Sequence, residues 1–240
     1  MCFAGTRIDS RSATSGDGLG GRQRHWHCPL MVMVWDFLKD DTVPRLPNRA
    51  RVVLTMALVG TVTGLISSLP TPLPSIRLED DGLILNTASS PLHAGLAFAA
   101  GVAVCMWAWV SRDVSKCLLT AMLVFLGWLA AVNTANDLYQ LLIGSGVFGT
   151  DTGAKATREA SGLIVGGVVA GGVGAGLSAF GAGIPAVPIR QPRNWGLIVS
   201  AGAAAGAMLY PAAMLRMPYM LFVPWQALVA ASIGFGLTRR

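Results

Sequence analysis

The chain has 240 residues, of which 53% are hydrophobic and only 12% are charged, and its formal net charge is +6. Soluble domains carry about 25% charged residues, so a water-soluble fold of this length would lack its usual charged shell. The charged residues stand in short patches between long apolar runs, which is typical of a chain that crosses a bilayer repeatedly. Most basic residues flank these runs on one predicted side, which indicates membrane topology rather than nucleic-acid binding. Composition therefore predicts an integral membrane protein whose partner is the lipid bilayer and not nucleic acid.

The first 51 residues differ from the rest of the chain. Residues 1–29 are rich in Ser, Gly, Thr and Arg and lack the apolar stretch of a signal peptide. We predict a disordered tail there, with a translation start at Met31 or Met33 as an alternative. Residues 30–51 combine an apolar run that is too short to span with a basic, proline-containing linker, and we predict an interfacial segment. The transmembrane domain is predicted to occupy residues 52–240.

Six apolar runs follow, each about 20 residues long, which is the length that crosses ~30 Å of hydrocarbon at ~1.5 Å per residue. The runs lack the short alternating segments of a transmembrane barrel, so the predicted fold class is all-α, a polytopic bundle of six transmembrane helices. In chain order the predicted spans are 52–69, 92–110, 117–135, 161–184, 195–214 and 219–237. Pro211 and Pro224 are expected to kink the last two spans.

The distribution of Lys and Arg predicts the orientation of this bundle. With both chain ends in the cytoplasm, the outer flanks hold few basic residues: Arg77, Lys155, Arg158 and Arg216. The inner flanks hold many more: Lys39, Arg45, Arg49, Arg51, Arg112, Lys116, Arg190, Arg193, Arg239 and Arg240. Because positive charge is retained on the cytoplasmic side, we predict an N-in, C-in protein of the cell membrane.

Small residues recur at helical spacing in the fourth and fifth spans. The most regular of them are Gly162, Gly166, Gly167, Gly171, Gly174, Gly202 and Gly206. In lipid, helices associate where small residues let their backbones approach closely, so we interpret these glycines as helix-packing faces. Two alternatives stay open: the faces bind other helices in a homo- or hetero-oligomer, or the glycines line a narrow path for a small solute.

The candidate polar site lies at the outer end of the third span. Asn133, Asn136, Asp137 and Gln140 follow i, i+3, i+4, i+7 spacing and so share one helical face. A carboxylate at membrane depth suggests a cation or proton site, with Gln226 of the sixth span as a partner from another helix. The alternative is ordinary hydration, because Asp137 lies roughly 31 Å beyond Lys116 along a straight helix and thus at the outer interface.

The sequence indicates a function class only weakly. The spans lack the paired carboxylates and the His or Cys sets of catalytic sites, so we predict no catalytic, metal or cofactor-binding residues and disfavour an enzyme. A component of a small-solute or ion permease is favoured, and it predicts a polar cavity near Asn133 and Gln226. The alternative is a non-catalytic subunit or scaffold that binds partner helices through its Gly/Ala-rich faces, and it predicts no cavity.

Overall fold

A computed structural model describes residues 48–70, 76–77, 84–86, 91–145 and 155–239. All of these residues belong to one compact unit, which covers Thr42–Arg240. The predicted tail at 1–29 lies outside the described residues, as does the predicted interfacial segment before residue 48.

Six helices in the described part of the chain are long and apolar enough to cross a membrane, which confirms the prediction of a multi-pass helical protein. Five of the six spans are single helices: α2 (Arg49–Ser67), α3 (Leu92–Trp109), α4 (Val114–Gly144), α5 (Lys155–Gly183) and α8 (Tyr219–Leu237). The remaining span consists of α6 (Pro192–Gly206) followed by α7 (Leu209–Leu215), and a short 3-10 helix, η2 (Val187–Arg190), precedes it. Helices satisfy their own backbone groups, which is what the bilayer demands.

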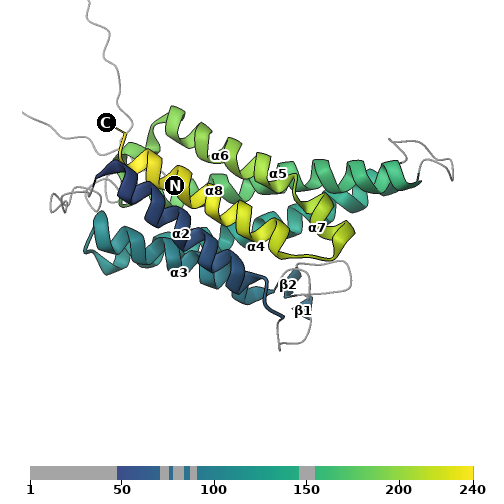
Figure 1. Cartoon of the computed structure of the whole chain (residues 1–240), viewed down its shortest axis with the longest axis horizontal. Helices are drawn as coiled ribbons and strands as arrows, with labels where there is room; N and C mark the ends of the chain where they lie inside the picture. Colours follow the sequence, from purple (N-terminus) through teal and green to yellow (C-terminus); the bar gives the residue numbers. More distant parts are fainter. Residues whose placement is uncertain (1–47, 71–75, 78–83, 87–90, 146–154, 240) are drawn as a thin grey trace, which may run out of the picture. The chain divides into compact units, whose positions relative to one another are not determined.

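Three details of the fold differ from the predicted spans. Helix α4 continues to Gly144 and α5 begins at Lys155, so both helices extend well beyond the hydrocarbon length at one end (Figure 1). The fifth span is broken at residues 207–208, because Pro211 has no backbone N–H to donate to the carbonyl four residues earlier. Between α2 and α3, the strands β1 (Ile76–Arg77) and β2 (Ile84–Asn86) form a short antiparallel pair in which Ile76 faces Asn86.

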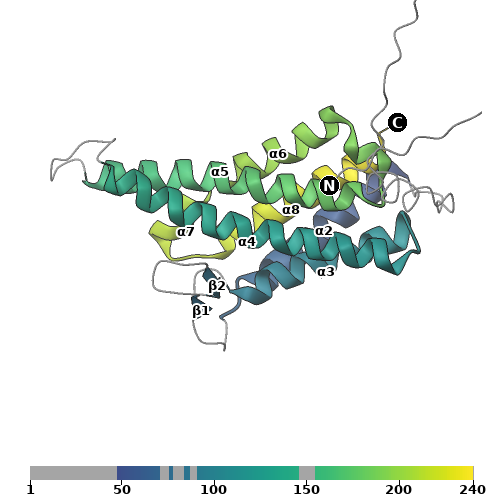
Figure 2. The ribbon, with the colours of Figure 1, turned by 180° about the vertical axis from the view of Figure 1, so that it is seen from behind.

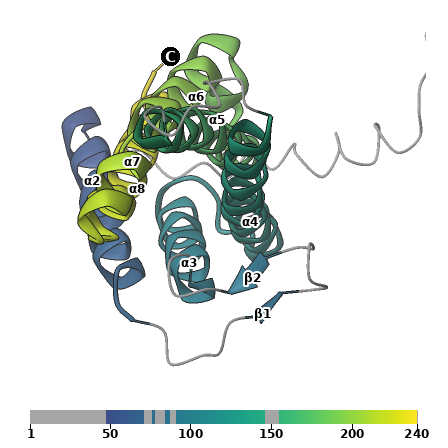
Figure 3. The ribbon, with the colours of Figure 1, turned by 90° about the vertical axis from the view of Figure 1, so that its right-hand side faces the viewer.

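The spanning helices pack as a closed ring. Each packs on two neighbours, in the order α2, α3, α4, α5, α6, α8 and back to α2. Viewed along the helices, α4 and α8 lie on opposite sides of the ring, with α3 and α5 between them (Figure 3). The view from behind in Figure 2 shows α4 and α5 side by side over most of their length, in agreement with their extensive contact. Because α8 packs on α2, the first and last spans of the chain close the ring around the interior of the bundle.

The outward surface of the ring is apolar. Leu54, Val104, Leu118 and Phe180 are each more than 60% exposed, and they come from four different helices. A soluble protein does not leave large apolar side chains so exposed over several helices, whereas in a membrane they contact lipid. The exposed surface thus supports the same conclusion as helix length.

Basic side chains cap one end of the ring. Arg49 at the start of α2 stacks on Phe235 near the end of α8 with 4.2 Å between guanidinium carbon and ring centroid, and Arg239 lies 5.4 Å from the same ring. At the α5–α6 connection, Arg190 donates from Nε to Gly183 O (2.7 Å) and from Nη2 to Ile184 O (2.9 Å). These carbonyls end α5 and have no partner within the helix, so Arg190 completes that helix end. Partial burial lowers the pKa of the Arg190 guanidinium from its ordinary value.

Candidate functional site

The polar residues predicted as a site lie at separate places in the structure. Asn133 is a structural anchor: its Oδ1 accepts from Ile84 N at 2.8 Å, and its Nδ2 donates to Ile84 O at 3.1 Å and to Leu129 O at 2.8 Å. The side-chain amide therefore holds strand β2 against α4. Its hydrogen-bonding groups are used by the backbone, as expected for a half-buried amide.

The other predicted polar residues of α4 lie toward its surface. Asp137 and Gln140 are exposed and Asn136 is half-buried. Asn136 Nδ2 donates to Asp137 Oδ1 at 3.3 Å, and this is the contact that the structure makes within the predicted group. The structure brings these two side chains together at the surface of α4, where Asp137 is exposed.

Gln226 belongs to a different cluster, between α8, α2 and α3. It is fully buried, and its Nε2 donates to Ser67 Oγ of α2 at 2.8 Å. Ser67 in turn donates to Thr63 O (2.7 Å) and lies 3.4 Å from Ala94 O of α3. Gln226 Oε1 is buried without a hydrogen-bond partner among the described residues. The amide thus links three helices through Ser67 and leaves one acceptor unused.

The glycines of α5 lie on two faces that contact different helices. On one face, a methyl group at Gly171 would lie 3.0 Å from Gly206 Cα of α6, and one at Gly167 would overlap Gly206 O. Gly202 packs in the same seam, where an added methyl would lie 2.6 Å from Gly171 O. This contact, the glycine seam, joins α5 and α6 almost backbone to backbone. Close approach of this kind needs residues without side chains.

The opposite face of α5 contacts α4. A methyl group at Gly166 would lie 3.2 Å from Ala135 O, and one at Gly174 would lie 3.0 Å from Ala131 Cβ. Gly162, nearer the start of α5, packs at 3.3 Å from the Tyr139 ring by the same measure. The predicted small-residue faces of α5 are therefore both covered within this chain, by α4 on one side and by α6 on the other.

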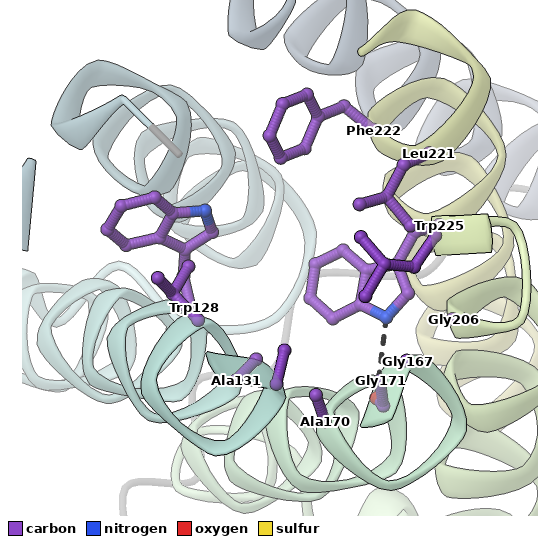
Figure 4. A pocket seen from close by; sticks show the side chains of 12 residues that line it. Trp128, Ala131, Gly167, Ala170, Gly171, Gly206, Leu221, Phe222 and Trp225 are labelled. Carbon is purple, nitrogen blue, oxygen red and sulfur yellow. Dashed lines mark hydrogen bonds between the residues drawn. The ribbon is translucent and has the colours of Figure 1, made fainter. Parts of the chain in front are cut away.

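A cavity of about 100 Å³, partly open to the outside, lies inside the ring. Helices α4, α5 and α8 line most of it, and the ends of α6 and α7 contribute Gly206 and Leu209. Figure 4 shows Trp128 of α4 and Trp225 of α8 on opposite walls, with Ala170 of α5 between them. The lining side chains are all Ala, Val, Leu, Phe or Trp, or glycine, so the cavity is apolar and the predicted polar residues do not line it.

The two indole rings that face the cavity differ in one respect. Trp225 Nε1 donates to Gly171 O at 3.3 Å, whereas Trp128 Nε1 is buried and has no partner in the part of the chain that the structure describes. Buried polar groups normally have a hydrogen-bond partner, and a buried indole usually finds one for its N–H. Trp128 Nε1 is therefore a buried donor without the usual partner, and its ring lines this cavity.

The position of these tryptophans along the membrane is unusual. Trp128 follows the start of α4 by 14 residues, roughly 21 Å along the helix, and Trp225 precedes the end of α8 by 12 residues, roughly 18 Å. Both therefore stand near the middle of a ~30 Å hydrocarbon core, whereas Trp in membrane proteins is enriched at the interfaces. That mid-span position was the available signal for this cavity, and polar spacing alone missed it.

Among the described residues, no group of three or more His, Cys, Asp or Glu is placed to hold a metal ion. Cys105 and Cys117 are buried free thiols in α3 and α4. The chemistry that the central cavity offers is thus an apolar space with one unused donor, the indole N–H of Trp128, among the described residues that line it. No protein family, curated protein or solved structure matches this chain.

Proposed function

We propose that this chain is a multi-pass protein of the cell membrane that binds a small, neutral molecule in its central cavity, as one component of a permease. The observation that carries the proposal is the cavity between Trp128 and Trp225, near the middle of the bilayer and lined by apolar side chains. Ligand sites are typically concave, mostly apolar and equipped with few polar groups. The cavity is partly open to the outside, so a bound molecule can exchange with the surroundings.

A neutral solute fits this interior better than an ion. Cations in proteins are held by oxygen ligands or carboxylates, and the side chains that line the cavity offer none. Asp137, the carboxylate of the predicted site, is exposed on the outer part of α4 instead. The ion-permease prediction has its own test: cation flux into proteoliposomes that the substitution Asp137→Asn abolishes.

The orientation of the protein is part of the proposal. The ring end that carries Arg49, Arg112, Arg190 and Arg239 is proposed to face the cytoplasm, because basic residues are retained on that side. In Figure 1 this is the end where α2 begins and α8 ends. Reporter fusions at the Ser145 and Thr238 ends of α4 and α8 would test it, and location of both reporters on one side of the membrane would contradict it.

The test of binding is photolabelling with a small aryl diazirine, an apolar probe, on the purified protein in nanodiscs. We expect adducts on the peptides that contain Trp128 and Trp225, and their loss in the variant Ala170→Leu, which fills the cavity. Ala204→Leu is the matched control, because Ala204 is an exposed alanine of the neighbouring helix α6. Unchanged labelling of the two tryptophan peptides in Ala170→Leu would contradict the proposal.

A second candidate function, a scaffold that binds a partner helix, is favoured by a groove on the outer face of α5 and α6. Gly172 and Gly176 lie in this groove beside Trp195, and methyl groups there would meet neighbouring atoms no closer than 3.4 Å. These glycines have room for a partner, unlike Gly166 and Gly174, which α4 covers. Loss of a co-purifying chain in Gly172→Leu, with the folded bundle retained, would support the scaffold.

A further inference from the structure

We infer that the molecule held in the central cavity carries an acceptor oxygen, such as a carbonyl, and that Trp128 Nε1 donates a hydrogen bond to it. This inference rests on the proposed function and names the ligand class: a neutral, mostly apolar molecule with one exposed oxygen acceptor. The observation is a donor that is buried, unpartnered within the described residues and directed at an apolar space.

The direction of this donor is visible in the structure. Figure 4 shows the nitrogen of Trp128 on the edge of its ring that faces Phe222 and Trp225 across the cavity. The Trp128 side chain as a whole is only 3% exposed. Nε1 is itself among the buried atoms of this residue. A ligand acceptor would therefore reach the N–H from the cavity side of the ring, which is the side that Figure 4 shows.

Packing prevents the Trp128 ring from turning to another acceptor. A methyl group at Gly95 of α3 would lie 2.6 Å from Cδ2 of this ring, so the ring is seated directly on the α3 backbone. The ring of Phe125 also stacks on it nearly parallel, with 6.1 Å between the ring centroids. The donor is fixed in one direction before any ligand arrives, which is the preorganisation that lowers the cost of binding.

Neither the protein nor a water molecule is well placed to satisfy this donor. Across the cavity, Gly171 O already accepts from Trp225 Nε1, and the lining side chains contain no oxygen. A buried water is normally held by two to four polar partners, and apolar cavities stay dry and take up apolar molecules instead. A carbonyl on an apolar ring or chain would match both the walls and the donor.

The size of the cavity sets the scale of the ligand. An engineered apolar cavity of ~150 Å³ in another protein accommodates benzene, and this cavity encloses about 100 Å³ with a partial opening. The enclosed part therefore suits one small ring or the carbonyl-bearing end of a longer molecule. A free ketone and the ester group of a bilayer lipid share this chemistry.

The experiment compares two probes of the same shape, cyclohexanone and methylenecyclohexane, on the full chain in nanodiscs. The indole ¹⁵N–¹H resonances report binding, and Trp128→Phe assigns the resonance of interest. We expect cyclohexanone to bind about tenfold more tightly, a difference of ~1.4 kcal/mol, and to move the Trp128 N–H resonance downfield. In Trp128→Phe the two probes are expected to bind equally.

Trp225→Phe is the matched control, because its indole lines the same cavity but donates to Gly171 O. It is expected to keep the preference for the ketone. Equal affinities in the unmodified protein, a preference that survives Trp128→Phe, or failure of cyclohexanone to bind would each overturn the inference. Equal binding of both probes would leave the proposed binding function standing, whereas binding of neither would remove both.

A second comparison distinguishes the two sources of the carbonyl. Without added probe, nanodiscs of ester-linked and ether-linked phospholipid are compared through the same Trp128 resonance. A downfield position in ester lipid alone assigns the site to a lipid carbonyl, and identical positions assign it to a free solute. Either result is interpreted together with the cyclohexanone titration, which decides whether Trp128 Nε1 donates a hydrogen bond to a ligand.

Discussion

The glycine seam between α5 and α6 and the space between α4 and α8 are opposite solutions to packing inside one ring. In the seam, Gly171 and Gly206 bring two backbones together with no side chain between them. Across the interior, Trp128 and Trp225 face one another, and a cavity remains between their helices. The same bundle is closed at the seam and held open beside it, since Gly167, Gly171 and Gly206 of the seam also line the cavity.

The difference shows what closes a helix bundle in lipid. Without a hydrophobic drive between helices, association depends on close contact between surfaces, and glycine allows the closest. Two helices that face each other with large rings cannot approach as closely as two glycine faces, because each ring occupies volume between the backbones. Where both rings also rest on other helices, as Trp128 does on Gly95, the space between them is not filled.

The largest effect is expected from one methyl group placed in the seam. In Gly206→Ala the new Cβ would overlap Gly167 O and lie 2.8 Å from Gly167 C, so the two helices must separate. Overpacking typically costs 1–3 kcal/mol, and we expect about 3 kcal/mol here because both partners are backbone. The measurement is the free energy of unfolding in mixed micelles titrated with SDS.

Gly196→Ala is the control for this substitution. Gly196 lies on the same helix, and nothing is within 4 Å of the position a Cβ would take. Because alanine is a better helix former than glycine by up to ~1 kcal/mol, this variant is expected to be neutral or slightly stabilised. Equal losses in both variants would show that the loss does not depend on the close contact at Gly206, and the seam would lose its special role.

The contact between α2 and α8 is expected to give a smaller effect, because it contains the polar pair Ser67 and Gln226. Ser67→Ala removes the acceptor of Gln226 Nε2 and leaves the whole buried amide without a side-chain partner. We expect a loss of about 1 kcal/mol, since hydrogen bonds between membrane helices average only ~0.6 kcal/mol. Gln226→Leu removes the unpartnered oxygen as well and is expected to cost less than Ser67→Ala. The reverse order in SDS unfolding would contradict this account.

Among the packed regions, filling the cavity is expected to change the free energy of unfolding least. Ala170→Leu adds three carbons where the cavity has room, whereas Gly206→Ala adds one carbon where there is none. Cavity-filling substitutions commonly stabilise by 0.5–2 kcal/mol, and we expect a change within about 1 kcal/mol, toward greater stability. A loss as large as that of Gly206→Ala would show that the interior is closed in solution.

The sequence predicted the bounds of the spans far better than it predicted which helices contact one another. Apolar runs and prolines fixed six helices, and α8 matches its predicted bounds at both ends. The small faces of α5 were visible as spacing, but spacing cannot say which helix covers a face, since Gly166 and Gly167 are adjacent and contact α4 and α6 respectively. The break before Pro211 was located only approximately, because proline disturbs the turn that precedes it.

The site was harder to predict than the fold because a shared helical face does not determine a shared neighbour. Asn133 and Asp137 are four residues apart, yet the first bonds to strand β2 and the second is exposed. Strand β2 comes from a loop about 50 residues earlier, and nothing in the periodicity of α4 indicates it. The central cavity likewise lies between spans that are distant in sequence, and hydropathy treats the residues that line it as ordinary apolar positions.

The smallest effect is expected outside both packed regions, where Asn133 holds the β1–β2 pair to α4. Asn133→Ala removes two hydrogen bonds to Ile84, together with the side-chain bond to Leu129 O within α4. Because a net hydrogen bond contributes about 1 kcal/mol, hydrogen exchange at the Ile84 amide is expected to accelerate about fivefold or more, while global unfolding changes little. Asn136→Ala, one turn further along, is the control and is expected to leave that amide unchanged. If Asn133→Ala lowered global stability as much as Gly206→Ala, the strand pair would be an integral part of the ring, and the contrast between seam and interior would no longer account for where the bundle is held together.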